Sequence, residues 1–312
     1  MISIYSTAVK NELRTLTEIE PGSWLRLVMP TESELRLVAE KTGAPEDFLR
    51  AALDDDESPR IETEEEYTLI IADTPIVKPE GTSYIYSTIP LGIILSDDYF
   101  ITVSTEQTTL LSDFSEKRVR GGFDTCKRTR FLLQILYRNA GKYLSYLRQI
   151  DKQNAQIQAI LVKSMKNREL LQMLNLEKSL VYFSTSLKGN EIVLEKLLRG
   201  NMVRRYPDDT DLLEDVIIDN KQAIEMCAIH RDITASTMDT FASIISNHLN
   251  IVMKLQAAIS ILIAIPSVIA GFWGMNVPVP FEHIPSAFYI IIGVSVLATG
   301  LMALFMRHRK MF

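Results

Sequence analysis

The chain has 312 residues and a formal net charge of −6 at pH 7. A chain of this length accommodates two ordinary domains, or one domain and a membrane part. The negative charge argues against a protein that binds nucleic acid through a general basic surface, because contacts to phosphates need a positive face.

The first 125 residues mix strand and helix signals. The sequence Thr-Glu-Ser-Glu at residues 31–34 is a capping box that begins a helix over 31–41, and a second helix is expected over 45–53. Strands are expected where β-branched and aromatic residues are dense, at residues 24–28, 67–72, 91–95 and 99–103. These signals predict an N-terminal α/β domain over residues 1–125.

A basic cluster lies at the end of this domain and flanks two glycines. Its members are Lys117, Arg118, Arg120, Lys127, Arg128 and Arg130. No aromatic platform for stacking bases is interleaved with them, so we interpret the cluster as a solvated linker face. Cys126 and Cys227 lack the spacing of a zinc ribbon or a disulfide framework.

Helical periodicity replaces the strand signals from residue 126 onward. Helices are expected over 130–166 and 176–205, and Pro207 ends this helical region of residues 126–207. Three aspartates at 208, 209 and 211 favour the start of the next helix. No helix breaker then occurs before Pro266, which predicts one helix over 208–273 of about 65 residues and about 100 Å. A helix of this length needs neighbours to be stable.

Two apolar segments, residues 255–273 and 287–306, each have the length that crosses a bilayer. The loop between them, residues 274–286, has no lysine or arginine. In contrast, Lys254 precedes the first segment, and Arg307, Arg309 and Lys310 lie in a basic tail, residues 307–312. The positive-inside rule therefore places both termini in the cytoplasm and the loop outside it. We expect a multi-pass protein of the cell membrane with the lipid bilayer as a partner.

The first apolar segment carries a stripe of small and polar residues. Steps of three and four give Asn250, Met253, Ala257, Ser260, Ala264, Ser267, Gly271 and Gly274. Close helix packing is one explanation for small residues at this spacing. However, the stripe continues backwards through Ser246, Ser243, Asp239, Ser236 and Asp232. A water-filled axis between several identical helices explains polar groups over so many turns, because one two-span subunit cannot enclose a pore.

An axis lined by amide, hydroxyl and small groups suits a hydrated cation. Mg²⁺ gives up its water reluctantly, so a pore for this ion does better to hydrogen-bond the water shell than to remove it. Asn276 stands at the outer end of the segment, where it would offer a ring of oxygens. Glu282 in the loop would raise the local concentration of cations.

The tripeptide Gly274-Met275-Asn276 ends the first of two C-terminal spans, after a very long helix and before an acidic loop. In this placement it resembles the CorA family of magnesium channels and transporters. The resemblance implies an α+β membrane protein that assembles as a homopentameric funnel, in which an N-terminal cytosolic α/β domain and a long helical stalk lead into the first transmembrane helix. It also implies that Gly274, Met275 and Asn276 select hydrated Mg²⁺, which enters under the membrane potential. No organic cofactor is expected.

The resemblance also implies roles for residues deeper in the pore. The asparagine at the inner mouth of the family's pore and the methionine one turn later match Asn250 and Met253, and a pore hydroxyl next to Pro266 matches Ser267. The family's hydrophobic constriction has leucine and methionine where this chain has Gln256 and Ala264. A wider and more polar neck is harder to dry. The expected pore-lining set is Asn250, Met253, Gln256, Ala257, Ser260, Ala264, Ser267 and Gly271.

Regulation by cytosolic Mg²⁺ is a further implication of the resemblance. The family uses an aspartate of the stalk helix between subunits, and Asp239 matches that position. The partner carboxylate aligns with Ala51, while Asp54, Asp55 and Asp56 follow about one turn later. The alternative for this acidic run is a solvated helix end.

No enzyme is expected, because the sequence contains neither a phosphate-binding GxxxxGK[ST] loop nor an HExxH helix, and its histidines lack metal-ligand spacing. Two alternatives to a magnesium channel remain. One is a transporter of another divalent cation of the same superfamily, such as Co²⁺, Ni²⁺ or Zn²⁺. The other is a membrane-tethered sensor or scaffold that conducts nothing, for which a polar stripe across the bilayer has no purpose.

Overall fold

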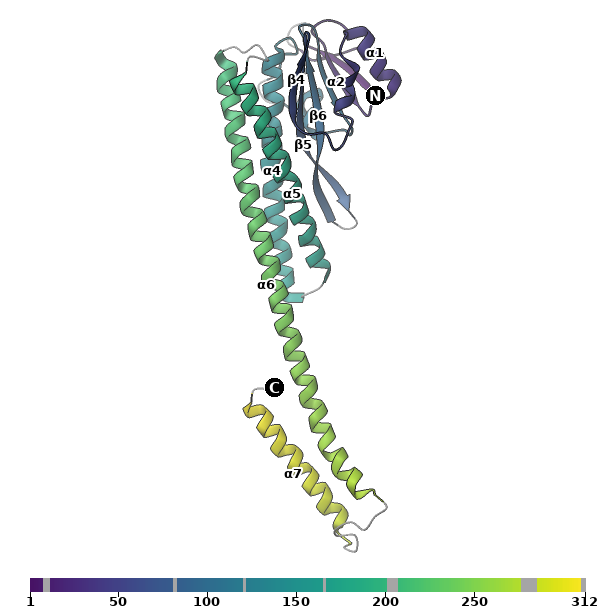
Figure 1. Cartoon of the computed structure of the whole chain (residues 1–312), viewed down its shortest axis with the longest axis vertical. Coiled ribbons are helices and arrows are strands. Elements are labelled where there is room, and N and C mark those ends of the chain that lie inside the picture. Colours follow the sequence, from purple (N-terminus) through teal and green to yellow (C-terminus); the bar gives the residue numbers. More distant parts are fainter. Residues whose placement is uncertain are drawn as a thin grey trace. The chain divides into compact units, whose positions relative to one another are not determined.

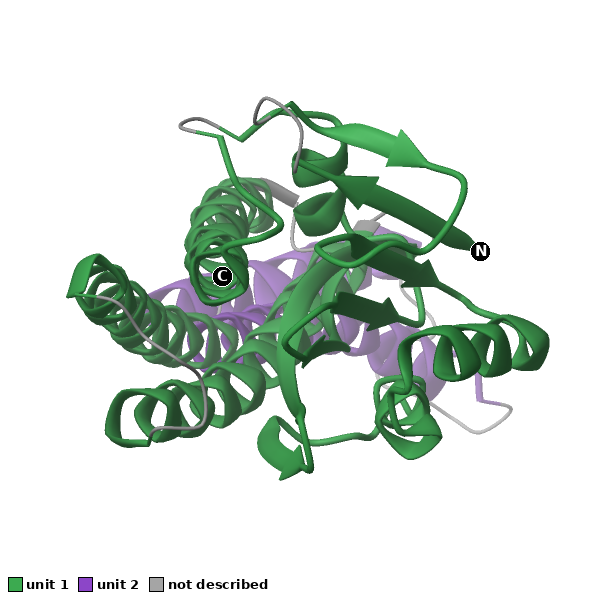
Figure 2. Ribbon diagram, turned by 90° about the horizontal axis from the view of Figure 1, so that it is seen from above, with its two compact units in different colours: residues 1–238 green, residues 239–312 purple. Residues whose placement is uncertain are grey.

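The structure is a computed structural model that describes residues 1–7, 12–80, 83–119, 122–164, 167–200, 207–275 and 285–309. Its contacts divide the chain into two compact units, unit 1 with residues 1–238 and unit 2 with residues 239–312 (Figure 2). Each unit is described by itself.

Unit 1 is built on a seven-stranded sheet with the order β2-β1-β3-β7-β6-β5-β4. The strands are β1 (Ile2–Ser6), β2 (Arg14–Leu16), β3 (Trp24–Val28), β4 (Arg60–Glu64), β5 (Tyr67–Glu80), β6 (Ser83–Leu95) and β7 (Phe100–Ser104). β3 and β7 pair in parallel, and the other neighbours pair antiparallel. The four predicted strands are confirmed, although β5 and β6 extend well beyond the predicted segments.

Helices cover both faces of this sheet (Figure 1). Successive strand residues contribute side chains to opposite faces. On β5, Leu69 and Ile71 join a core with α1 (Glu32–Thr42) and α2 (Glu46–Ala51). The intervening Ile70 and Ala72 join the second core, with α3 (Thr109–Ser115), α4 (Arg128–Ser164), α5 (Asn167–Arg199) and the start of α6. This alternation buries both faces of the sheet. The expected α/β domain is therefore present.

The capping box predicted at Thr31 is present at the start of α1. The Glu34 N–H donates to the Thr31 hydroxyl at 3.3 Å, and the Thr31 N–H donates to the Glu34 carboxylate at 2.8 Å. α1 ends at Gly43, whose φ of 77° lies in the left-handed region that glycine favours. The sequence thus encodes both ends of this helix locally.

The helices α4 and α5 are both present, but the bounds predicted for the second one, residues 176–205, are wrong at both ends, because α5 ends at Arg199 and Gly200 lies outside it. α4 agrees with the helix expected over 130–166 within two residues at each end. The start predicted for the second helix, residue 176, is wrong, because α5 begins at Asn167. Residues 170–174, Leu-Leu-Gln-Met-Leu, favour a helix, and Met173 is buried.

Helix α6 (Pro207–Trp273) has 67 residues, as the absence of helix breakers predicted. Pro207 occupies its first position, where the missing N–H is not needed by the helix, and Pro266 lies inside it. Helix α7 (Ala287–His308) extends two residues beyond the second predicted apolar segment. Unit 2 contains the second part of α6 and all of α7, which runs back beside α6 (Figure 1).

Candidate functional site

Unit 2 exposes an unusual amount of apolar surface. The most apolar 18-residue window of α6 has a mean hydropathy of 2.1, and that of α7 has 2.3. These windows are almost entirely unburied, and both helices are long and apolar enough to cross a membrane. The two predicted spans are therefore present as helices whose side chains need an apolar environment outside the chain.

One face of α6 forms a seam with α7. Ala258 is completely buried, and Leu262, Ile265, Ile269 and Trp273 are partly buried. Steps of four, three, four and four place these residues on a single helix face. On α7, the buried residues are Ala287 and Met306, near its two ends. The second span thus packs along this one seam.

The stripe of small and polar residues lies on the face of α6 opposite the seam. Ser260, Ala264, Ser267 and Gly271 each stand two positions from a seam residue, which corresponds to about 200° around the axis at 3.6 residues per turn. The stripe is exposed throughout, at Asn250, Met253, Ala257, Ser260, Ala264, Ser267, Gly271 and Gly274, and so is Gln256, the other expected pore-lining residue. Packing against the chain's own second span therefore does not explain it.

Gly271 supports the same conclusion. A Cβ atom built on Gly271 meets no heavy atom within 4 Å. Nothing in the described part of the chain thus requires a glycine at this position. Contacts with the described residues therefore do not explain the small residue at position 271.

The hydroxyl groups of the stripe donate to their own helix. Ser260 Oγ donates to the Gln256 carbonyl at 2.9 Å, and Ser267 Oγ donates to the Ile263 carbonyl at 2.9 Å. Because each hydroxyl proton is engaged, the oxygen presents lone pairs as acceptors on the exposed face. Water molecules around a cation turn their hydrogens outward. A surface of acceptors therefore suits a hydrated cation better than a hydrated anion.

The described residues stop within the predicted selectivity tripeptide. Trp273 ends α6, and Gly274 donates its N–H to the Ala270 carbonyl at 2.9 Å. Gly274 and Met275 are both exposed. Asn276 and Glu282, the two polar groups expected at the outer mouth, lie outside the described residues.

The predicted regulatory carboxylates are exposed. Asp239 lies on α6, with no ion pair in the described part of the chain. Asp54, Asp55 and Asp56 form a turn after α2, in which the Asp56 N–H donates to Asp54 Oδ1 at 3.0 Å. Among the described residues no three His, Cys, Asp or Glu side chains gather into a possible metal site.

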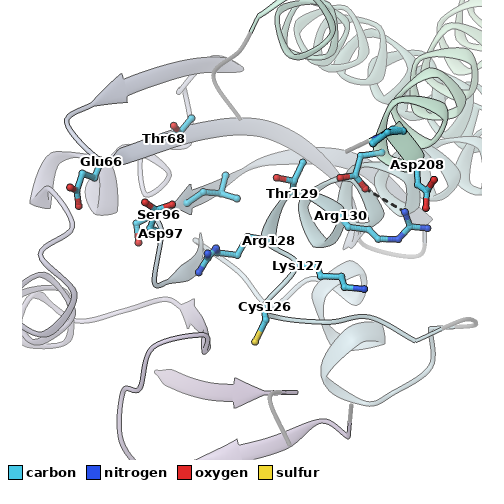
Figure 3. A pocket seen from close by; sticks show the side chains of 13 residues that line it. Glu66, Thr68, Ser96, Asp97, Cys126, Lys127, Arg128, Thr129, Arg130 and Asp208 are labelled. Atoms are coloured by element: carbon cyan, nitrogen blue, oxygen red, sulfur yellow. Dashed lines mark hydrogen bonds and ion pairs between the residues drawn. The ribbon is translucent and has the colours of Figure 1, made fainter. Parts of the chain in front are cut away.

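Part of the basic cluster lines a cavity of about 850 Å³ in unit 1 (Figure 3). Arg130 Nη1 lies 3.4 Å from Asp209 Oδ1, and this ion pair joins the first turns of α4 and α6. Lys127 and Arg128 share the cavity wall with Glu66 and Asp97. Charges of both signs therefore line the cavity, and the solvated-linker interpretation is incomplete because these cations belong to the start of α4.

The periodicity of the sequence predicted the stripe, but it did not predict the seam with α7. Ala258, Leu262, Ile265 and Ile269 resemble the neighbouring lipid-facing residues in composition. One feature of the sequence could have predicted the seam: Leu262, Ile265 and Ile269 follow the small residue Ala258 at steps of four, three and four. Only contact with α7 separates this face from the other apolar faces.

The model of the family described as CorA-like Mg²⁺ transporter protein matches residues 21–308, which include the stripe and both apolar helices. The chain belongs to this family. A transporter family agrees with the prediction that the chain is not an enzyme. Among curated proteins, the cobalt/magnesium transport protein CorA of Methanocaldococcus jannaschii is 28% identical over 279 residues, which cover 88% of this chain and 86% of the relative.

Solved structures extend this similarity to the fold. The complete CorA magnesium transporter of Methanocaldococcus jannaschii superposes with a TM-score of 0.83 at 23% identity, covering 100% of this chain and 99% of that structure. The soluble domain of the same protein gives a TM-score of 0.68 at 25% identity, covering 77% and 95%. The ZntB cytoplasmic domain from Vibrio parahaemolyticus gives 0.60 at 12% identity, covering 78% and 98%. Because structures with these different names share the fold, the fold alone does not identify the ion.

Proposed function

We propose that this protein is a channel that carries Mg²⁺ into the cell, with α6 helices of several identical subunits lining the path. The observation that carries this proposal is the exposed stripe on α6, opposite the seam with α7. The family and the cobalt/magnesium relative support a divalent cation as the transported ion. A non-conducting scaffold has no use for acceptor oxygens across a bilayer.

The path requires an assembly, because two spans of one chain cannot enclose it. A homopentamer, the assembly that the resemblance implies, places five stripes around one axis. The engaged hydroxyls of Ser260 and Ser267 then accept hydrogen bonds from the ion's water shell. At the outer end, Gly274, Met275 and Asn276 select the hydrated ion, and Glu282 attracts cations. At the other end, Lys254, Arg307 and Arg309 keep the termini in the cytoplasm.

Regulation by cytosolic Mg²⁺ acts between subunits in this proposal. Asp239 is exposed and without an ion pair in the described part of the chain, so its carboxylate is free to bind a cation that a neighbouring subunit shares. Asp54, Asp55 and Asp56 are the proposed partners. Binding of Mg²⁺ would hold subunits together while the ion is abundant in the cytosol, and its loss would loosen the stalk.

Uptake of Mg²⁺ into proteoliposomes tests the path through the stripe. Ala264→Trp places a large ring on the stripe, where the single chain leaves space. We expect it to reduce uptake at least about tenfold, because five rings would converge on one axis. Leu297→Trp is the matched control, since Leu297 is 65% exposed and lies on α7 away from the seam. Its uptake should remain near that of the wild type.

Three results would overturn parts of this proposal. Equal uptake of Mg²⁺ by Ala264→Trp and Leu297→Trp would mean that the stripe does not line the ion path. Unchanged discrimination between Mg²⁺ and other divalent cations in Asn276→Ala would remove the selectivity assignment. No uptake of Mg²⁺, Co²⁺, Ni²⁺ or Zn²⁺ by the wild type, even at low internal Mg²⁺, would favour the scaffold.

A further inference from the structure

Positive charge without a counter-charge gathers at one end of the two apolar helices. Lys254 precedes the apolar segment of α6, and Arg307 and Arg309 follow that of α7. All three side chains are exposed, and none has an ion-pair partner in the part of the chain that the structure describes. Residues 240–275 and 285–309 contain no aspartate or glutamate. A carboxylate that pairs with these cations would have to come from outside these two segments.

The three cations lie at one depth along the hairpin. The short connection between Trp273 and Ala287 brings these two residues to the opposite end of the seam. From Trp273 back to Lys254 and from Ala287 on to Met306, each helix covers the same number of residues, about 28 Å at 1.5 Å per residue. Lys254 therefore lies at the level of Met306, the residue that precedes Arg307 in α7. This level is the boundary of the apolar surface.

Arg309 is directed toward the apolar surface instead of away from it. Its guanidinium carbon lies 5.7 Å from the centre of the Phe305 ring, in a cation–π contact. Phe305 is 55% exposed, and the neighbouring Leu301 and Leu304 are 60% and 64% exposed. The guanidinium thus lies where a bilayer would present its phosphates, directly beside side chains that would contact acyl chains.

We propose that Lys254, Arg307 and Arg309 bind the phosphate of an anionic phospholipid at this end of the hairpin. Arginine suits this ligand because its planar fork of donors matches two phosphate oxygens. The exposed Phe305, Leu301 and Leu304 favour a lipid over a dissolved phosphate, since only a lipid covers them as well. The proposal rests on the membrane placement of α6 and α7 and is independent of ion conduction.

Lipid nanodiscs test this site without measuring transport. The full chain is placed in discs of phosphatidylcholine with or without phosphatidylglycerol, and the lipids that remain bound are counted by native mass spectrometry. For the wild type we expect phosphatidylglycerol to be enriched around the protein and to raise its melting temperature. Enrichment should fall roughly fivefold for each of Lys254→Gln, Arg307→Gln and Arg309→Gln.

Two control variants distinguish binding at this site from nonspecific attraction between any positive side chain and the anionic lipid. Lys152→Gln removes an exposed cation from α4 and should leave the enrichment unchanged. Arg309→Lys keeps the charge but loses the planar fork of donors, so it should lose part of the enrichment, less than Arg309→Gln loses. A nanodisc exposes both faces of the membrane. The orientation in which the chain inserts, which these cations also influence, therefore does not alter the measured lipid enrichment. Circular dichroism of the helices, with the fluorescence of Trp24 in unit 1 and Trp273 in unit 2, verifies that each variant is folded.

Equal enrichment in the wild type and in the variant that combines Lys254→Gln, Arg307→Gln and Arg309→Gln would overturn the proposal. A second arm adds inorganic phosphate to phosphatidylcholine discs. If phosphate alone reproduces the melting shift, the site binds the anion and not the lipid, and the lipid assignment is wrong. Loss of Mg²⁺ uptake has no bearing on either result, so a failure of the channel proposal remains distinguishable.

Discussion

The two units of this chain differ in how their apolar surface is covered. Unit 1 buries its large side chains within the chain, and Trp24, Phe100, Phe114 and Phe131 have no exposed surface. In unit 2, the buried apolar residues among those described are Phe241, Ala258, Ala287 and Met306. Unit 1 thus has a large apolar core within the single chain, whereas most apolar side chains of the two helices of unit 2 are exposed.

Polar side chains show the same difference. In unit 1, buried amides connect separate elements: Asn139 Nδ2 donates to the Asp73 carbonyl at 2.7 Å, and Asn220 Nδ2 donates to the Leu187 carbonyl at 3.1 Å. In unit 2, Ser260 and Ser267 donate within their own helix. Polar groups therefore connect separate elements of unit 1, while these hydroxyls of unit 2 connect no second element.

Truncation of one aromatic side chain in each unit should give the largest difference. Phe131 anchors the start of α4 to the sheet, with ring centres 4.4 Å from Phe100 and 5.2 Å from Trp24. We expect Phe131→Ala to lower the free energy of unfolding of unit 1 by about 3–5 kcal/mol, because it leaves a cavity in the core. Thermal melting of the full chain in detergent, followed by Trp24 fluorescence, measures this loss.

Phe288 in α7 is the matched control. It is 67% exposed, so Phe288→Ala should change the melting of unit 1 by no more than about 0.5 kcal/mol. The second tryptophan, Trp273, lies in unit 2 and can be replaced with phenylalanine so that Trp24 reports alone. Similar decreases in the free energy of unfolding for Phe131→Ala and Phe288→Ala would contradict the view that the core of unit 1 folds independently of the exposed helices of unit 2.

Two helix glycines provide a second, smaller test inside unit 1. A Cβ atom on Gly189 of α5 would lie 2.8 Å from Pro59 Cγ, whereas one on Gly141 of α4 meets nothing within 4 Å. Alanine improves helix propensity at both positions. We therefore expect Gly189→Ala to be less stable than Gly141→Ala by about 1–3 kcal/mol, because only the methyl group at position 189 would clash with a neighbouring side chain.

Melting temperatures of the two variants, compared with the wild type, measure this difference. Gly141→Ala should melt slightly above the wild type. Equal shifts for both variants would mean that α5 and the segment before β4 separate readily, and that the contact at Pro59 contributes little to unit 1.

Local signals predicted the ends of several elements. The capping box predicted the start of α1, and the apolar segments predicted the end of α6 at Trp273 and the start of α7 at Ala287. Three strands and α3 were missed. β4, with the sequence Arg-Ile-Glu-Thr-Glu, has one apolar residue and pairs only with β5 at the edge of the sheet. Its backbone partner, and not its own composition, makes it a strand.

The candidate path was predictable as a pattern, but its surroundings were not. Packing and water-lining both select small residues every three or four positions, so the sequence left both explanations open. The seam at Ala258 and Leu262 excludes packing of the stripe on α7, since it occupies the other side of α6. The roles of Asn276, Glu282 and Asp239 stay predictions, because they depend on other subunits or lie outside the described residues.

The smallest expected effect concerns Asp73 at the junction between the sheet and the long helices. Its backbone carbonyl accepts from Asn139, Tyr143 and Asn190, and burial raises the pKa of its carboxyl group above the ordinary value of 3.8. Between that value and the raised pKa, the native state binds the proton more tightly than the unfolded chain. The free energy of unfolding contributed by Asp73 therefore rises as the pH falls through the raised pKa.

Asp73→Asn isolates this contribution, because asparagine has a similar shape and does not titrate. We expect the variant to be slightly more stable than the wild type at neutral pH, where the buried carboxylate is charged. The difference should shrink as the pH falls, since protonation relieves the wild type of the same charge. Melting temperatures of both proteins across this pH range give the difference directly. If the difference in melting temperature between the two proteins instead grows as the pH falls, the interior of unit 1 stabilises the Asp73 carboxylate as an anion, which contradicts the prediction.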